Sequence, residues 1–227
     1  MRQYFITGTD TDVGKTVAST ALVTAFAASG CRVAGHKPIS AGCDLVSVGT
    51  NEVALRNEDA QLLMAQANVE LPYDVVNPFA FKEPIAPHIA ALRTGHEISA
   101  SGLLDNYSDL TRYGLDVLIS EGAGGWMLPI NEHQILPDVV QQLDIDIILV
   151  VGMRLGCLNH ALLTQQAIAS SGLKLAGWIA NAPDKQPYFE ENLKTLTARI
   201  TAPLLGVIPH VNDATNAASY LDISLLN

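Results

Sequence analysis

The chain has 227 residues, of which 48% are hydrophobic and 16% charged, and its formal net charge is −10. This length and hydrophobic content exclude a disordered protein and allow a large buried core. The negative charge argues against a general affinity for nucleic acid or an anionic membrane, so any bound phosphate must be held by a few local cations and backbone N–H groups.

Short apolar segments alternate with helix-length segments, and Gly, Pro, Asn or Asp separate them. The expected strands are 4–7, 31–37, 116–120, 145–151, 173–180 and 204–208. The expected helices are 15–29, 58–67, 99–113, 136–143, 159–171 and 188–200. Apolar strands without strict alternation, separated by helices, predict an α/β fold with a parallel sheet flanked by helices on both faces. Since the pattern shows no repeat or linker, we expect a single domain over 1–227, with functional loops at the carboxyl ends of the strands.

The segment 7–16, TGTDTDVGKT, lies between the first strand and the first helix, where a phosphate-binding loop is expected. The usual pattern is G-x-x-x-x-G-K-[ST], but here the first glycine is Gly8 and residue 9 is threonine. An ordinary glycine-rich turn is the alternative. Because Gly14, Lys15 and Thr16 open the helix, the pattern favours a P-loop NTPase-like fold, with Lys15 on the outer phosphates and Thr16 on Mg²⁺.

Three other segments place charged side chains near strand or helix ends. GHKPIS, 35–40, puts Lys37 at the carboxyl edge of the sheet beside the first strand, although a surface lysine before a turn is the alternative. SEGAGGWMLPI, 120–130, puts Glu121 where phosphate-loop enzymes hold Mg²⁺, although it could also cap a turn. In RNEDAQLL, 56–63, the position of Asp59 alone predicts a helix cap.

Together these segments resemble the dethiobiotin synthetases, ATP-dependent enzymes of biotin synthesis. The resemblance covers nearly the whole chain, through TGTDTDVGKT, GHKP, NEDA, VNPFAFKEPIAPH, SEGAGGW, ILVVGMRLGCLNHALLT, LAGWIAN and PLLGVIPH. It implies a homodimer that converts 7,8-diaminopelargonic acid, CO₂ and ATP into dethiobiotin, ADP and phosphate. The implied route passes through a carbamate and a carbamic-phosphoric anhydride and requires Mg²⁺. Preference for ATP over other triphosphates stays open.

The resemblance also implies residue roles. The implied metal ligands are Thr16, Asp59 and Glu121, which replaces the cap interpretation of Asp59. The implied nucleotide-binding residues are Thr11, Asp12, Val13, Gly14, Lys15, Thr16, Asn181 and Pro209. The implied substrate contacts are Thr11, Lys37, Ser40, Gly122, Gly156, Cys157 and Asn159, the last three at a helix start that meets the substrate carboxylate across the dimer interface. Lys15 and Lys37 would stabilise negative charge, while Asp12 or a phosphate would take the amine proton.

The chain departs from the family pattern in three places. Ala41 stands where the family usually has Ser or Thr, and Ser40, one position earlier, should point the other way in an extended segment. That hydroxyl contact is therefore either shifted or missing. Arg154 replaces a frequent lysine, and His210 replaces an aromatic residue expected near adenine.

Two other classes of protein share a phosphate loop. The synthase half of an amidotransferase normally comes with a glutaminase domain that has a catalytic cysteine, which 227 residues and three isolated cysteines do not suggest. Partitioning or membrane-positioning ATPases carry a lysine four residues before the last glycine of the loop, where this chain has Asp10. A loop that only held triphosphate would gain nothing from Asp10 and Asp12, whereas a cationic diamine would explain both.

The sequence gives no reason to expect export or membrane insertion. The first residues lead straight to Gly8 without the apolar stretch of a signal peptide, and the apolar run 145–153 contains an acid and is too short to span a bilayer. The cysteines at 31, 43 and 157 lack metal-site spacing and cannot all pair with one another. We therefore expect a cytoplasmic protein with reduced thiols and with no nucleic-acid or membrane partner.

Overall fold

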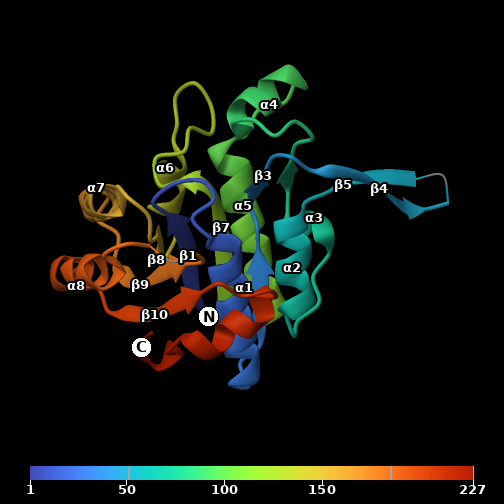
Figure 1. Cartoon of the computed structure of the whole chain (residues 1–227). Coiled ribbons are helices and arrows are strands. Elements are labelled where there is room, and N and C mark those ends of the chain that lie inside the picture. Colours follow the sequence, from blue (N-terminus) through green and yellow to red (C-terminus); the bar gives the residue numbers. More distant parts are fainter. Residues whose placement is uncertain (51, 185, 227) are drawn as a thin grey trace.

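The computed structural model describes residues 1–50, 52–184 and 186–226. Six parallel strands form the central sheet in the order β10-β9-β8-β1-β7-β2 (Figure 1). Their bounds are β1 Arg2–Gly8, β2 Val33–His36, β7 Val117–Gly125, β8 Asp146–Gly152, β9 Leu175–Ala182 and β10 Leu204–Pro209. The predicted parallel sheet and its six strands are confirmed. That the whole chain is one domain stays a prediction.

Helices cover both faces of this sheet, as predicted. One face carries α1 (Lys15–Ala28), with α2 (Glu58–Gln66) and the 3₁₀ helix η2 (Ala214–Tyr220) against it. The other face carries α5 (Ala100–Leu110), α6 (Leu136–Val140), α7 (Cys157–Ser170) and α8 (Phe189–Arg199). Successive strand residues point to opposite faces, so Tyr4 and Ile6 pack toward α1 while Phe5 packs into the other core. Both faces are apolar, which explains why the strands do not alternate in polarity.

The elements that the sequence did not predict are short or project from the body. An antiparallel hairpin of β4 (Asp44–Gly49) and β5 (Glu52–Arg56) extends outward from the edge of the sheet (Figure 1). The remaining short elements are β3 Ile39–Ser40, β6 Phe79–Ala80, α3 Tyr73–Val76, α4 Pro87–Arg93, η1 Thr111–Tyr113 and η3 Ile223–Leu225. The predicted helix 99–113 ends in η1 rather than continuing as one α-helix, and α6 stops at Val140. No helix in the described ranges is both long enough and apolar enough to span a membrane.

Candidate active site

A cleft of about 1200 Å³ opens at the carboxyl ends of β1, β2 and β7. The loop after β1 forms one wall, and the ends of β2 and β7 with the start of α2 form the next. The segment 123–129 and the middle of α7 line the far side. Ligands of open α/β sheets bind at this edge, so the predicted functional segments meet where the fold would place a ligand.

The displaced glycine of the phosphate loop is the last residue of β1. A Cβ on Gly8 would lie 2.6 Å from Cγ2 of Val13 and 3.0 Å from the carbonyl oxygen of Asp10, so the loop folds back too closely for any side chain there. Gly14 has φ 90°, and a Cβ on it would overlap the side-chain amide of Asn181. The longer loop is therefore a tightly packed structure that opens α1 at Lys15, as predicted.

The two acids of the loop behave differently. Asp10 accepts a hydrogen bond from the backbone N–H of Thr11 at 2.8 Å and is paired with Arg154, whose Nη2 lies 2.6 Å from its Oδ2. Asp12 is exposed, lines the cleft, and makes no ion pair with any residue in the described ranges. Its φ of 55° is left-handed, which is uncommon for a residue other than glycine and is found often at ligand sites. Of the two loop acids, Asp10 is therefore already paired, while Asp12 faces the cleft. That either acid meets a cationic substrate stays a prediction.

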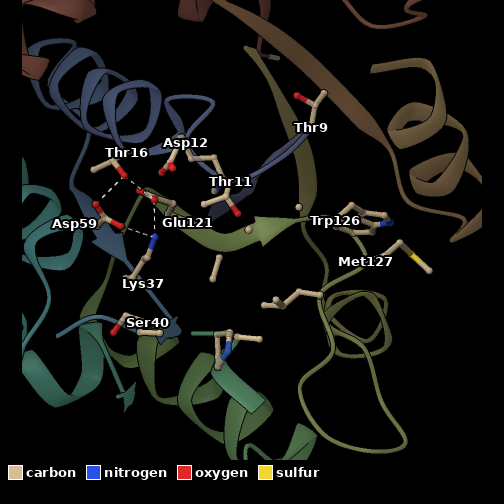
Figure 2. Close-up of a pocket in the computed structure, with 18 of the residues that line it drawn as sticks. Thr9, Thr11, Asp12, Thr16, Lys37, Ser40, Asp59, Glu121, Trp126 and Met127 are labelled. Carbon is tan, nitrogen blue, oxygen red and sulfur yellow. Dashed lines mark hydrogen bonds and ion pairs between the residues drawn. The ribbon is translucent and has the colours of Figure 1, made fainter. Parts of the chain in front are cut away.

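Four side chains from separate elements meet at the base of the cleft (Figure 2). The ammonium of Lys37 lies 2.6 Å from Oε1 of Glu121 and 2.8 Å from Oδ2 of Asp59. The hydroxyl oxygen of Thr16 lies 2.8 Å from Oδ1 of Asp59 and 3.0 Å from Oε1 of Glu121. The three residues expected to hold Mg²⁺ are thus brought together, and Lys37 lies among them.

The strand register brings Lys37 and Glu121 together. In the parallel pair of β2 and β7, His36 is the partner of Ser120, and each is followed by one of the two charged residues. Nδ1 of His36 lies 2.9 Å from Oγ of Ser120, on the side of the sheet that packs against Tyr107 of α5. Lys37 and Glu121 project to the opposite side, where α1 begins. The pair of His36 and Ser120 is therefore buried in the core, while the pair of Lys37 and Glu121 faces the cleft.

The cap interpretation of Asp59 is wrong. Oδ1 of Asn57 accepts a hydrogen bond from the backbone N–H of Ala60 at 3.2 Å, so Asn57 caps α2. Asp59 stands in the first turn and points toward Thr16 and Lys37 instead. An asparagine directly before the helix is itself a strong cap signal, and it could have identified the cap from the sequence.

The electrostatics of the cleft favour charged lysine and carboxylate groups in close contact. Burial lowers the pKa of Lys37, but the carboxylates of Glu121 and Asp59 outweigh burial, so the net pKa is raised. Burial raises the pKa of Asp59, and the Lys37 ammonium outweighs this, so its net pKa is lowered. Burial, assisted by the charge on Lys37, lowers the pKa of Lys15 to about 8. The two lysines of the cleft thus differ, since the pKa is lowered for Lys15 and raised for Lys37.

The cluster fits a hard divalent cation. Oε2 of Glu121 is buried and has no hydrogen-bond partner among the described residues, which leaves a carboxylate oxygen for another ligand beside Thr16 and Asp59. Mg²⁺ prefers one or two carboxylates together with phosphate oxygens and water. The described ranges contain no group of three or more His, Cys, Asp or Glu side chains that could hold a metal ion. A cation at this cluster would therefore also need phosphate oxygens or water as ligands.

Several predicted ligand residues lie close to the cleft but are already engaged. Ser40 lines the cleft, and its hydroxyl donates to Oδ1 of Asn77 at 2.8 Å. The carbonyl oxygen of Gly122 accepts from the Lys37 ammonium at 3.3 Å. The side-chain amide of Asn181 donates to the carbonyl oxygen of Val13 at 3.0 Å, beneath the phosphate loop. Pro209 ends β10, next to the strand that carries Asn181.

The predicted substrate residues at the start of α7 lie outside the cleft of the chain. Gly156, with φ 94°, precedes the helix, Cys157 is buried, and Asn159 is exposed. The lining residues from α7 are instead Leu163, Thr164 and Ala167. The fold of one chain therefore does not bring these three residues to the predicted substrate residues in the cleft.

Sequence reasoning missed several residues at or near the site. Trp126 and Met127 line the cleft, with Trp126 packed edge-on against Phe5. Asn77 and Tyr73 lie behind the cleft. Asn77 is hydrogen-bonded to the backbone of Lys37, and Tyr73 to the backbone of Asn57 at the start of α2. The VNPFAFKEPIAPH run was part of the family resemblance, but nothing in its spacing indicated which partner Asn77 would find.

Known proteins are similar to this chain over most of its length. A family model described as an AAA domain matches residues 2–218. The ATP-dependent dethiobiotin synthetase BioD of Aeromonas salmonicida is 48% identical over 100% of this chain and 99% of its own length. The protein of the same name from Aeromonas hydrophila subsp. hydrophila is 47% identical over the same shares, and that of Cellvibrio japonicus is 45% identical over 99% and 97%.

Solved structures show the fold alone. The MinC:MinD cell division protein complex of Aquifex aeolicus matches with a TM-score of 0.58 and 14% identity over 96% of this chain and 86% of that chain. The signal recognition particle receptor FtsY of Elizabethkingia anophelis matches with a TM-score of 0.52 and 13% identity over 99% and 63%. Both likenesses support the predicted phosphate-loop α/β architecture.

Proposed function

Since the chain belongs to the family of ATP-dependent dethiobiotin synthetases, we propose that its cleft converts 7,8-diaminopelargonic acid, CO₂ and ATP into dethiobiotin, ADP and phosphate. The enzyme is then a ligase of biotin biosynthesis. The observation that carries the proposal is the convergence of Lys15, Thr16, Lys37, Asp59 and Glu121 on one cleft beside Asp12, an acid without an ion-pair partner among the described residues. A phosphate site, a metal site and an amine site then share one cavity.

ATP is proposed to bind with its triphosphate on the loop and the start of α1. Backbone N–H groups at a helix N-terminus favour phosphate oxygens. The ammonium of Lys15 donates to the carbonyl oxygen of Asp10 at 3.0 Å, and it can exchange this neutral acceptor for an anionic phosphate oxygen. We propose Asn181 and Pro209 for the adenine end because they lie on β9 and β10 beside the loop.

Mg²⁺ is proposed to bind at Thr16, Asp59 and Glu121. When bound there, it would offset negative charge on the phosphate oxygens. The supporting observations are the unpartnered buried oxygen of Glu121 and the oxygen ligands around it. Lys37 lies at the same place and brings a second positive charge to the site of reaction.

The proposed chemistry requires positioning and charge stabilisation. A neutral amine of the diamine attacks CO₂ and loses a proton to give a carbamate. A carbamate oxygen attacks the γ-phosphorus and releases ADP, and the second amine then attacks the carbamoyl carbon and expels phosphate as the ring closes. Lys15 and Lys37 stabilise the negative charge of each anionic intermediate in these steps. Asp12 orients the cationic diamine or accepts its proton, and no covalent nucleophile is needed.

The carboxylate end of the diamine is proposed to bind in a homodimer. Gly156, Cys157 and Asn159 form the start of α7, where backbone N–H groups can receive a carboxylate. Because these residues do not line the cleft of their own subunit, they would serve the cleft of a partner subunit. Leu155 is 99% exposed beside them, which gives the start of α7 apolar surface to bury in a dimer.

The test is ADP release by purified protein with ATP, Mg²⁺, bicarbonate and the diamine. We expect release to require both the diamine and bicarbonate, with one dethiobiotin formed for each ADP. ATP hydrolysis that is equally fast without the diamine, or that is stimulated by DNA or lipid vesicles, would contradict the proposal and favour a partitioning-type ATPase.

A further inference from the structure

Asn77 is a buried polar residue that lies behind the cleft rather than in its lining. It is 3% exposed and follows α3. The proposed chemistry assigns no role to this segment, and Asn77 is not among the residues that line the cleft. A buried asparagine must satisfy both ends of its amide. Its partners therefore show what the segment holds together.

The amide of Asn77 holds the backbone of Lys37. Its Nδ2 donates to the carbonyl oxygen of Lys37 at 2.6 Å. The preceding residue completes this contact, because the backbone N–H of Lys37 donates to the carbonyl oxygen of Val76 at 2.8 Å. Both backbone polar groups of Lys37 are thus bound by residues 76 and 77. The position of the Lys37 ammonium therefore depends on this segment.

The other end of the same amide leads to α2. Oδ1 of Asn77 accepts from the hydroxyl of Tyr73 at 3.0 Å. The Tyr73 oxygen in turn accepts from the backbone N–H of Asn57 at 2.7 Å, so its own hydrogen is free to point at Asn77. Asn57 caps α2, and Asp59 stands two residues further along in the first turn. A continuous path of hydrogen bonds therefore joins the backbone of Lys37 to the helix start that carries Asp59.

We propose that Asn77 is a positioning residue for the reaction. One amide sets the Lys37 ammonium and the Asp59 carboxylate at their mutual distance of 2.8 Å, holding Lys37 directly and Asp59 through Tyr73. This rests on the proposed function, since Lys37 and Asp59 matter for turnover only if they face the substrates and the metal. Small displacements of such groups lower the catalytic rate strongly. Removing the outer partners of a metal site lowers activity or metal affinity about 10- to 100-fold.

The test compares variants that break one arm or both. Asn77→Asp keeps the shape and the acceptor toward Tyr73 but replaces the donor toward Lys37. Asn77→Ala removes both arms without adding charge, together with the acceptor that the Ser40 hydroxyl also uses. Tyr73→Phe leaves the Lys37 contact in place and removes the link to α2. Asn68→Asp is the matched control, because Asn68 also bridges backbone groups of the β2 region, Val33 N–H and Cys31 C=O, away from the cleft.

Two measurements separate positioning from support of the fold. We expect both Asn77 variants to lower kcat about 10- to 100-fold with KM for ATP nearly unchanged. Tyr73→Phe should mainly raise the Mg²⁺ concentration needed for half-maximal rate and weaken calorimetric binding of Mg²⁺ with a nonhydrolysable ATP analogue. Asn68→Asp should change only the melting temperature. The proposal is overturned if the Asn77 and Tyr73 variants, corrected for folded fraction, match the control in kcat and in Mg²⁺ binding.

The two proposals fail in different ways. If the wild-type protein shows no diamine-dependent ADP release, the proposed function is wrong. The calorimetric measurement needs no diamine, so it still decides whether Asn77 and Tyr73 set the metal-binding end of the cluster. Unchanged binding in all three variants would then reject the positioning role as well.

Discussion

The ammonium nitrogen of Lys37 lies 2.6 Å from Oε1 of Glu121, and both side chains are almost fully buried. The cation proposed to face the reacting carbamate is therefore held by a carboxylate proposed to hold the metal. Removing one partner of a buried pair leaves an uncompensated charge. Each partner should therefore affect both the stability of the protein and its response to Mg²⁺.

Replacing Lys37 should cause a double loss. In Lys37→Met we expect kcat to fall by orders of magnitude, because a cation facing the transition-state charge is lost. The free energy of unfolding should fall by about 3–5 kcal/mol, because Glu121 is left buried and unpaired. Mg²⁺ should stabilise this variant more than the wild type, as measured by melting temperature with and without the ion. Equal Mg²⁺ stabilisation of the two proteins would contradict a shared cation site.

Neutralising a proposed metal ligand should raise the requirement for Mg²⁺. For Glu121→Gln and Asp59→Asn we expect the Mg²⁺ concentration at half-maximal rate to rise about tenfold or more, since even outer partners of metal sites have effects of that size. Glu58→Gln is the matched control, because Glu58 lies on the same helical turn as Asp59 but is exposed. If Mg²⁺ titrations of the three variants coincide with wild type, the metal assignment is wrong.

The two loop acids should differ in their effect on the diamine. Asp12→Asn should raise KM for the diamine and leave KM for ATP close to wild type, since Asp12 lines the cleft unpaired. Asp10→Asn should change KM for the diamine less, because Asp10 is occupied by Arg154. Steady-state kinetics with each substrate varied in turn makes the comparison. A fall in kcat alone in Asp12→Asn would instead indicate that the carboxylate removes the amine proton.

A hydroxyl at position 41 should improve substrate binding. Ala41 lines the cleft, while the hydroxyl of its neighbour Ser40 is bonded to Asn77. We expect Ala41→Ser to lower KM for the diamine roughly 3- to 10-fold, the value of one added hydrogen bond. An unchanged KM would mean that another group already supplies this contact.

Burial of His36 should make the protein less stable in acid. Burial lowers the pKa of His36 to about 3, against 6.5 in the unfolded chain. The unfolded state therefore binds more protons between these values, so stability is fully present above pH 6.5 and is lost as the pH falls toward 3. From pH 7 to pH 5.5 this group alone should remove about 1 kcal/mol from the free energy of unfolding.

Denaturant unfolding at the two pH values measures that loss. The comparison is His36→Asn, which cannot titrate, and its free energy of unfolding should fall less on acidification than that of the wild type. Identical losses in the two proteins would show that His36 does not carry the effect. Oδ1 of Asn106, 2.8 Å from Nε2, should hold the neutral ring with its proton on that nitrogen, because the Asn106 amide already donates to Val75.

The sequence predicted those parts of the site that depend on local pattern. A charged residue that follows an apolar strand must lie at the carboxyl ends of the strands, and this predicted the places of Lys37 and Glu121. The Gly-Lys-Thr run predicted the start of α1. The contacts of Asn77 with Lys37 and Tyr73 could not be predicted, because they join segments whose spacing has no periodic signal. The pairing of Asp10 with Arg154 spans 144 positions and is likewise set by the tertiary fold.

The register of β2 has a consequence for folding as well as for activity. This strand has four residues, lies at the edge of the sheet, and pairs with β7. A shift of one residue in the pairing of β2 with β7 would exchange the two faces of the strand. A shift that set Lys37 opposite Ser120 would bury its ammonium in the apolar core, and a shift in the other direction would turn the His36 ring toward the cleft. Lys37, which is proposed to act on the substrates, thus also disfavours a misaligned β2. A search for folding-defective variants should therefore find this position, as should a search for inactive variants.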